Sequence, residues 1–173
     1  MTDIEYLRVN PRYVTQLRID ALINWGAILI ATLIFSYFLN APWVWLSLSA
    51  AAAVVLALIV LLTLWAPRRY RLTGYLVRED DIQYRTGALW RRQTAVPVNR
   101  IQHVEITQGP IERMLGLARL IIYTAGGSGS DLAVPGLPAD TAEHLREQVL
   151  GMVAELTSSE QEGFQDEAGI NQA

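Results

Sequence analysis

Two long apolar segments near the N-terminus dominate the pattern of hydrophobic and polar positions. Residues 21–39 and 43–65 contain no charged side chain. As helices they would be about 28 Å and about 34 Å long, enough to cross a bilayer. The connection at residues 40–42 is so short that it joins antiparallel neighbours. The pattern therefore predicts a transmembrane helical hairpin, with Pro42 in the first turn of the second helix.

Six arginines flank the two outer ends of this hairpin, whereas the connection is uncharged: Arg8, Arg12, Arg18, Arg68, Arg69 and Arg71. Because positively charged residues tend to remain on the cytoplasmic side of a membrane, we expect both termini, including the N-terminal segment 1–20, to be cytoplasmic. A cleaved signal peptide is the competing interpretation of the first span. It is disfavoured because the span begins far from Met1 and a second span follows directly.

Pro67 and the arginines after it are expected to end the second span. Beyond residue 66 the pattern changes to an alternation of apolar and polar residues. The segments that follow alternate, or are apolar and β-branched, in the manner of strands: residues 70–77, 82–86, 94–96, 101–107, 119–125 and 132–134. Polar or glycine-containing turns separate them, at residues 78–81, 87–88 and 126–131. We predict a mostly antiparallel sheet within one small cytoplasmic domain, residues 67–156.

Two helical segments accompany these strands. In residues 110–115 proline begins a short turn on which Ile111, Met114 and Leu115 share a face. The longer helix begins near Asp140 with a capping-box arrangement. Its apolar residues then form one stripe at helical spacing: Ala142, Leu145, Val149, Met152, Val153 and Leu156. Short strands closed by one amphipathic helix outline a PH-like antiparallel β-barrel plugged at an open end, so we expect an α+β membrane protein.

The C-terminal tail explains the acidic balance of the chain. The net charge is −3, but residues 157–173 contain four acidic residues and no Arg or Lys, so the remainder is slightly basic. The tail is rich in Ser, Gln, Glu and Gly and has too little apolar surface to order itself, so we expect it to be disordered. The absence of cysteine excludes disulfides, thiolate metal sites and a cysteine nucleophile.

Three motifs carry a resemblance to a known family. They are Val-Pro-Val-Asn-Arg-Ile-Gln-His-Val at 96–104, Gln-Gly-Pro-Ile-Glu-Arg-Met-Leu-Gly-Leu-Ala at 108–118 and Tyr-Thr-Ala-Gly-Gly at 123–127, with Val-Pro-Gly-Leu at 134–137 before the last helix. Over about residues 10–155 the chain resembles bacterial PH-domain membrane proteins of the YdbS type. The resemblance implies a PH-like domain on a two-span anchor in the bacterial cytoplasmic membrane. It also implies a role in assembly or envelope protection, without catalytic residues.

The titratable residues suggest no chemistry of their own. His103 and His144 belong to no set with metal-ligand spacing, and residues 79–81 lack the staggered oxygens of a calcium loop. The glycine-rich stretch 126–129 has neither a Gly-Lys-Ser/Thr continuation nor a following helix, so a hairpin tip is favoured over a phosphate loop. We therefore expect no enzymatic activity, cofactor or metal.

Arginine near the bilayer is the first candidate interaction site: Arg68, Arg69, Arg71, Arg91 and Arg92. Anionic headgroups attract each such residue by about 1 kcal/mol near the surface, so these arginines are candidate lipid contacts. Membrane topology alone also explains arginines after a span, and that interpretation is favoured for Arg68 and Arg69. Balanced charge and the lack of an aromatic stacking platform argue against nucleic acid.

Small residues within the spans are the second candidate: Ala27, Ala31, Ser49, Ala53 and Ala57. Such faces allow close approach of helix backbones, either within the hairpin or between subunits. Asn24 is expected to face a protein partner or the interface rather than lipid. Taken together, the sequence favours a non-enzymatic scaffold that assembles with itself or a related PH-domain membrane protein, with an anionic phospholipid sensor as the alternative.

Overall fold

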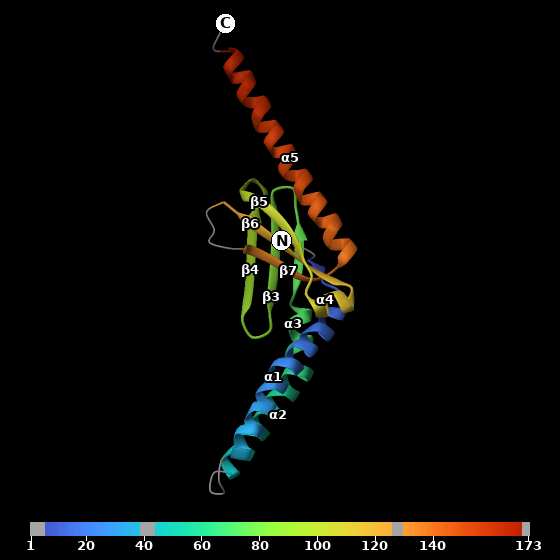
Figure 1. Cartoon of the computed structure of the whole chain (residues 1–173). Helices are drawn as coiled ribbons and strands as arrows, with labels where there is room; N and C mark the ends of the chain where they lie inside the picture. Colours follow the sequence, from blue (N-terminus) through green and yellow to red (C-terminus); the bar gives the residue numbers. More distant parts are fainter. Residues whose placement is uncertain (1–5, 39–43, 126–129, 171–173) are drawn as a thin grey trace.

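The molecule consists of three parts arranged along one long axis (Figure 1). A helical hairpin projects from one end of a β-sheet domain, and a long helix extends from the opposite end. The computed structural model describes residues 6–38, 44–125 and 130–170. The predicted connection at 40–42, and the glycine-rich stretch 126–129, lie outside the described residues.

The hairpin consists of α1 (Arg12–Phe38) and a second continuous helix formed by α2 (Val44–Val60), η2 (Leu61–Trp65) and α3 (Ala66–Arg71). Both arms are long and apolar enough to cross a membrane. Ser36 and Ser47 are hydrogen-bonded at 2.6 Å between their hydroxyl oxygens and join the two arms.

The second helix does not end at Pro67, where the second span was expected to end, but continues to Arg71. The segment η2 is a π-helical turn, in which the N–H of Ala66 donates to the carbonyl of Leu61 five residues earlier. A proline in a regular α-helix loses a hydrogen bond and clashes with the preceding turn. The wider π turn accommodates that defect, so the helix carries its arginines onward into the domain.

The domain contains two antiparallel sheets rather than a closed barrel. The first has the order β1-β2-β3-β4 and the second the order β5-β6-β7. The strands are β1 (Leu7–Arg8), β2 (Gly74–Val77), β3 (Asp81–Gly87), β4 (Arg91–Pro97), β5 (Ile101–Thr107), β6 (Leu117–Thr124) and β7 (Ser130–Pro138). The antiparallel arrangement and the central position of β6 are as expected from the sequence.

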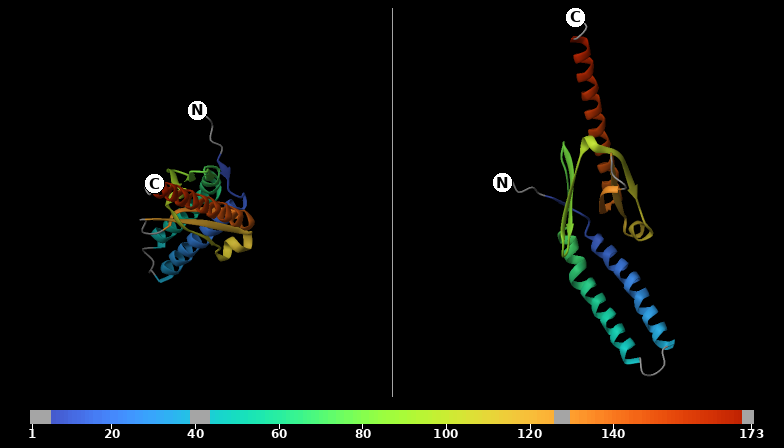
Figure 2. Two further views of the ribbon diagram at one scale, coloured as in Figure 1. Left: turned by 90° about the horizontal axis from the view of Figure 1, so that it is seen from above. Right: turned by 90° about the vertical axis from the view of Figure 1, so that its left-hand side faces the viewer.

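The expected PH-like β-barrel is not closed, and the connection between the two sheets shows where it is interrupted. After Pro97 the chain forms a short 3-10 turn, η3 (Val98–Arg100), which carries it from the first sheet to the second. Within the described residues β4 and β5 are not paired with each other, so the sheets form two facing layers (Figure 2). Because hydrogen bonds do not close the layers into one barrel, side chains of both sheets can line a space between them.

The last helix, α5 (Ala139–Ile170), packs against β5, β6 and β7. Ala142, Leu145 and Val149 are buried, and Met152 and Val153 are half-buried against the core, as the predicted stripe requires. In α4 (Pro110–Leu115) the predicted shared face is only partly used, because Met114 is 85% exposed. Gly116 ends α4 with a left-handed backbone (φ 67°), which glycine adopts without steric cost.

Residues 157–170 of the tail that was expected to be disordered are helical, because α5 continues to Ile170. Extending an existing helix avoids the cost of nucleation, and the Glu, Gln and Ala of this stretch are good helix formers. The helix therefore runs well beyond the part that covers the second sheet, as Figure 1 shows.

The residues before the hairpin, expected to be a separate cytoplasmic segment, form part of the domain. Leu7 and Arg8 pair with β2, and Val9, Tyr13 and Leu17 are buried in the core. The N–H of Asn10 donates to the carbonyl of Gly136 at 2.8 Å. A Cβ at Gly136 would lie 2.7 Å from the Tyr13 ring, so this glycine allows α1 to rest directly on β7.

Candidate functional site

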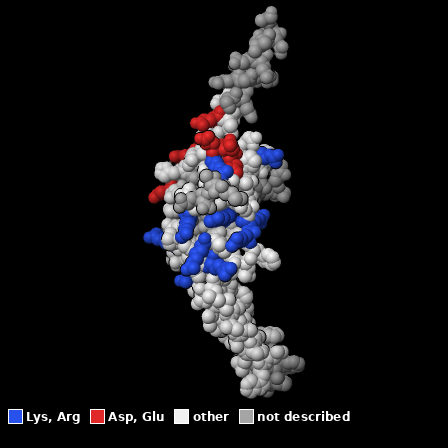
Figure 3. All heavy atoms as spheres, turned by 180° about the vertical axis from the view of Figure 1, so that it is seen from behind, with Lys and Arg blue, Asp and Glu red and all other residues white. Residues whose placement is uncertain are grey.

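Basic side chains gather where the domain meets the helical hairpin. Figure 3 shows most of the blue groups in a band directly beside the hairpin, with the red acidic groups farther away. The hairpin itself is almost uniformly uncharged in this view. On this face of the domain, the basic groups therefore lie toward the two apolar helices and the acidic groups lie away from them.

A pocket of about 340 Å³ opens within this basic region, between the two sheets. Arginines from three different elements line it: Arg69 of α3, Arg92 of β4 and Arg119 of β6. Its hydroxyl groups are those of Tyr13, Tyr84, Thr86 and Thr94. The described lining contains no acidic side chain, so the pocket presents hydrogen-bond donors and positive charge. We call it the arginine pocket.

Arg119 is held in place by the buried carboxylate of Glu112. Its guanidinium donates to Oε1 of Glu112 at 3.1 Å, while the N–H of Gly109 donates to Oε2 at 2.8 Å. Gln16 of α1 donates to the same Oε1 at 3.0 Å. Nε of Arg119 is buried and has no hydrogen-bond partner in the described part of the chain. Arg119 is therefore positioned and partly neutralised, but retains an unused donor.

Arg69, on α3 at the domain end of the second helix arm, extends into the lining of the arginine pocket. Its guanidinium carbon is 5.0 Å from the centre of the Trp65 ring, within cation–π range. Burial raises the pKa of the Tyr13 hydroxyl, and the neighbouring Arg69 opposes part of that rise. Burial also raises the pKa of Tyr84. Both hydroxyls therefore stay protonated near neutral pH and can donate hydrogen bonds alongside the guanidiniums.

A second cavity, of about 460 Å³, lies between α1 and the η2 end of the other arm. We call it the hairpin cavity. It shares Tyr13, Arg69 and Arg119 with the arginine pocket, so the two spaces meet at these three side chains. The remaining lining combines apolar and polar groups: Gln16, Leu17, Asp20, Ala21, Asn24, Trp25, Leu61 and Trp65.

The structure groups only some of the arginines singled out from the sequence. Arg69 and Arg92 meet in the arginine pocket, whereas Arg68 donates from Nε to the carbonyl of Ala88 at 3.0 Å and so holds the β3–β4 turn. Arg71 is exposed at the end of α3, and Arg91 lines a further pocket of about 410 Å³ with Arg85 and Arg92.

Arg119 was not predicted from the sequence as a site residue. The apolar pattern of its segment predicts a central strand. This pattern alone provides no reason to single out the arginine as a site residue. The available signal is that Arg119 is the one charged residue among the strand residues Leu117–Thr124. A lone arginine in an apolar central strand needs a partner, because burial of an unpaired charge is costly.

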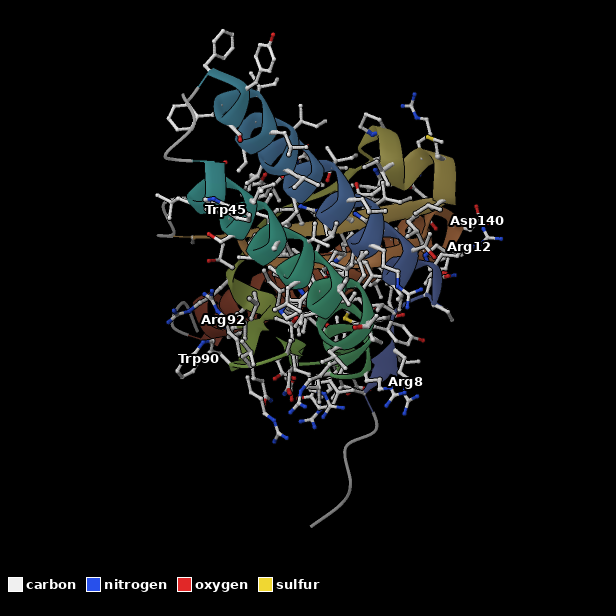
Figure 4. The ribbon with its side chains drawn as sticks, turned by 90° about the horizontal axis from the view of Figure 1, so that it is seen from below. Arg8, Arg12, Trp45, Trp90, Arg92 and Asp140 are labelled. Carbon is white, nitrogen blue, oxygen red and sulfur yellow. The ribbon has the colours of Figure 1, made fainter. Side chains whose placement is uncertain are left out.

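The turn between β3 and β4 carries two exposed apolar side chains. Leu89 and Trp90 are 82% and 88% exposed, respectively. Together with Trp65 and Arg69 they line a shallow depression, so the turn lies level with the domain end of the second helix arm. Figure 4 shows Trp90 and Arg92 on one edge of the molecule, with Arg12 on the opposite side.

The small residues of the hairpin mostly face outward. Ala27, Ala31, Ser49 and Ala53 are exposed, and Ala57 is half-buried. The contact between the two arms is made elsewhere, for example through Ser36 and Ser47. Asn24 donates from Nδ2 to the backbone carbonyl of Asp20 at 2.8 Å and lines the hairpin cavity.

The other candidate residues form no chemical centre. His103 and His144 are exposed, and the ring of His103 lies 5.9 Å from that of Tyr123. Glu105 accepts a hydrogen bond from the Tyr123 hydroxyl at 3.1 Å. No group of three or more His, Cys, Asp or Glu side chains in the described ranges is arranged to hold a metal ion.

Comparison with known proteins agrees with this architecture. The sequence model of the bacterial PH domain family matches residues 19–153. The chain is 31% identical over 122 residues to the UPF0699 transmembrane protein YdbS of Bacillus subtilis (strain 168), which covers 70% of this chain and 74% of that protein. No solved structure matches the chain significantly. The resemblance drawn from the three sequence motifs is confirmed, and the chain belongs to the bacterial PH domain family.

Proposed function

We propose that this protein is a membrane-anchored binding module whose arginine pocket holds the phosphate of an anionic phospholipid. In this proposal the hairpin crosses the bacterial cytoplasmic membrane, and the domain and both termini lie in the cytoplasm. The observation that carries the proposal is the convergence of Arg69, Arg92 and Arg119 on one pocket that has no acidic lining residue among those described.

The chemistry of the pocket suits a phosphate group. Guanidinium groups bind phosphate oxygens through paired, charge-assisted hydrogen bonds. Three guanidiniums around one pocket repel one another, and Glu112 pairs with only one of them. A bound anion would relieve that repulsion and would use the free donor of Arg119. The neutral hydroxyls of Tyr13 and Tyr84 would supply further donors.

The position of the pocket favours a lipid over a soluble phosphate compound. Arg69 stacks on Trp65, an aromatic residue of the kind that settles at the headgroup level of a bilayer. The exposed Leu89 and Trp90 lie beside them, where they would rest on the same bilayer surface. The basic band of Figure 3 would face the anionic leaflet, where each arginine gains about 1 kcal/mol.

The proposal is tested by lipid binding to the full chain, delipidated in a neutral detergent. The protein should bind phosphatidylglycerol more tightly than phosphatidylcholine, with an affinity that falls as salt increases. Arg92 is exposed on β4 and lines the pocket. Its replacement by Gln should weaken binding about tenfold if it loses about 1.4 kcal/mol of charge-assisted contact.

A matched control is Arg100→Gln, because Arg100 is also exposed but lies on η3 and does not line the pocket. This variant should bind as the wild type does. Equal affinity for both lipids, or equal affinity of the Arg92→Gln and wild-type proteins, would refute the proposed function.

A second candidate function is non-enzymatic assembly of the protein with itself or with a related PH-domain membrane protein. The outward orientation of Ala27, Ala31, Ser49 and Ala53 favours it, because a small-residue face that is not used within the hairpin can contact another helix. If so, Ala53→Leu should reduce the size of the complex in detergent, while Ala52→Leu, also exposed on α2 but turned away from Ala53, should not. Removal of Arg91 and Arg92 should leave the size unchanged.

A further inference from the structure

The hairpin cavity adjoins the arginine pocket on the side of the two apolar helices. The two spaces meet at Tyr13, Arg69 and Arg119. Beyond these side chains the cavity is polar on the side of Gln16 and Asp20, and apolar where Trp25 and Leu61 line it from the two arms. A ligand whose phosphate lies at the arginines would therefore find a polar and then an apolar environment on the side of the hairpin.

Gln16, which lines this cavity, carries an unsatisfied acceptor. The residue is 5% exposed, and its Oε1 has no hydrogen-bond partner in the described part of the chain. The amide cannot simply be turned over, because Nε2 donates to the carboxylate of Glu112 at 3.0 Å and an oxygen in that place would repel it. A buried acceptor without a partner is costly, so the site is complete only when a donor is present.

We propose that the hairpin cavity holds the part of a phospholipid that joins the phosphate to a chain, and that Gln16 Oε1 accepts a hydrogen bond from a hydroxyl group of that lipid. The proposal rests on the proposed function, because Arg69 and Arg119 hold the phosphate. It adds the ligand class: an anionic phospholipid with a free hydroxyl near its phosphate. The protein would thus bind the headgroup and the chain of one lipid molecule, in contrast to nonspecific electrostatic attraction to an anionic membrane surface.

The hydroxyl could belong to the headgroup of the lipid or to its glycerol backbone. Two matched pairs of lipids distinguish these two positions. Phosphatidylglycerol and phosphatidylmethanol have the same charge, but only the former has headgroup hydroxyls. Oleoyl lysophosphatidic acid has a hydroxyl on its glycerol backbone that the otherwise identical single-chain lipid 3-oleoyloxypropyl phosphate lacks. In competition binding to the delipidated full chain, the hydroxyl-bearing member of at least one pair should bind about tenfold more tightly. The pair that shows the preference identifies the position of the hydroxyl.

Gln16→Leu should remove the preference while the dependence on phosphate remains. Because Gln16 also contacts Glu112, this variant could fail to fold, so a second variant fills the cavity from another side. Ala21→Phe, on the lining of the cavity, should weaken binding of every chain-bearing lipid more than about tenfold. Binding of inorganic phosphate, which would occupy only the arginine pocket, should be unchanged. Ala50→Phe, exposed on α2 and away from the cavity, is the control for both measurements.

The outcomes separate this proposal from the one on which it rests. If wild-type protein binds anionic lipids but shows no hydroxyl preference in either pair, or if Ala21→Phe binds them normally, the hairpin cavity is not a lipid site and only the further inference fails. If the wild type binds neither anionic lipids nor inorganic phosphate, both proposals fail.

Discussion

Gln16 of α1 and Glu112 of α4 are hydrogen-bonded at 3.0 Å, although they are 96 residues apart in the sequence. The same carboxylate oxygen accepts from Arg119 at 3.1 Å. The first apolar helix is thus connected through one buried carboxylate to an arginine of the pocket. A displacement of α1 relative to the domain would be transmitted to the place where we propose the phosphate binds.

Glu112→Gln should destabilise the protein by about 1–3 kcal/mol, because the neutral amide weakens charge-assisted hydrogen bonds in a buried place. The measurement is thermal or denaturant unfolding in detergent. Glu143→Gln is the matched control, since Glu143 forms an exposed ion pair with Arg146 at 2.9 Å and should change stability by less than about 1 kcal/mol. Equal effects of the two substitutions would show that Glu112 does not have the structural role described.

Gly136→Ala should also destabilise the protein, by about 2 kcal/mol or more. The backbone of Gly136 has φ 72°, and a Cβ there would meet the Tyr13 ring at 2.7 Å. Both the strained backbone and the overlap act against the folded state. In Gly151→Ala, by contrast, nothing lies within 4 Å of the new Cβ on α5, so helix propensity should leave stability unchanged or raised. If the Gly136→Ala protein unfolds at the wild-type temperature, α1 does not rest on β7.

Much of the fold could be predicted because its signals are local and periodic. The two uncharged runs predicted the hairpin, and the stripe at Ala142, Leu145 and Val149 predicted the buried side of α5. The role of residues 7–17 could not be predicted in this way. The strand β1 has only two residues, too few to show alternation, and its pairing with β2 depends on chain brought together by the hairpin.

The arginine pocket was predicted only in part for a related reason. Arg69 and Arg92 were candidates because they are near a span in the sequence, but the same argument included Arg68 and Arg71, which face elsewhere. The continuation of the helix through Pro67 decides which of these arginines faces the pocket, and the local rule for proline predicted the opposite. Arg119 joins them only through the packing of the two sheets.

The orientation of the hairpin has a direct test, which is simple because the chain contains no cysteine. A cysteine introduced at Ala41 should react with a membrane-impermeant thiol reagent added to intact cells, because the connection should lie outside the cytoplasm. A cysteine at His103, exposed on β5, should react only after the membrane is permeabilised. The reverse pattern would place the domain outside the cytoplasm.

The β3–β4 turn should lie against the bilayer. In Trp90→Cys protein reconstituted into phospholipid nanodiscs, the thiol should react with a polar reagent several-fold more slowly than in the unfolded protein. Gln102→Cys provides the control, because this exposed position on β5 is part of the other sheet and should react rapidly in both states. Rapid reaction at both positions in nanodiscs would show that Leu89 and Trp90 stand clear of the membrane.

The central claim is that three arginines from separate elements form one phosphate site beside the membrane. Native mass spectrometry of the full chain, released from membranes in a mild detergent, tests it most directly. We predict that the wild-type protein retains one anionic phospholipid per chain, and that a variant with Gln in place of Arg69, Arg92 and Arg119 retains none while keeping its folded charge-state distribution. Retention of the same lipid by the folded triple variant, or its absence from the wild type, would contradict the account.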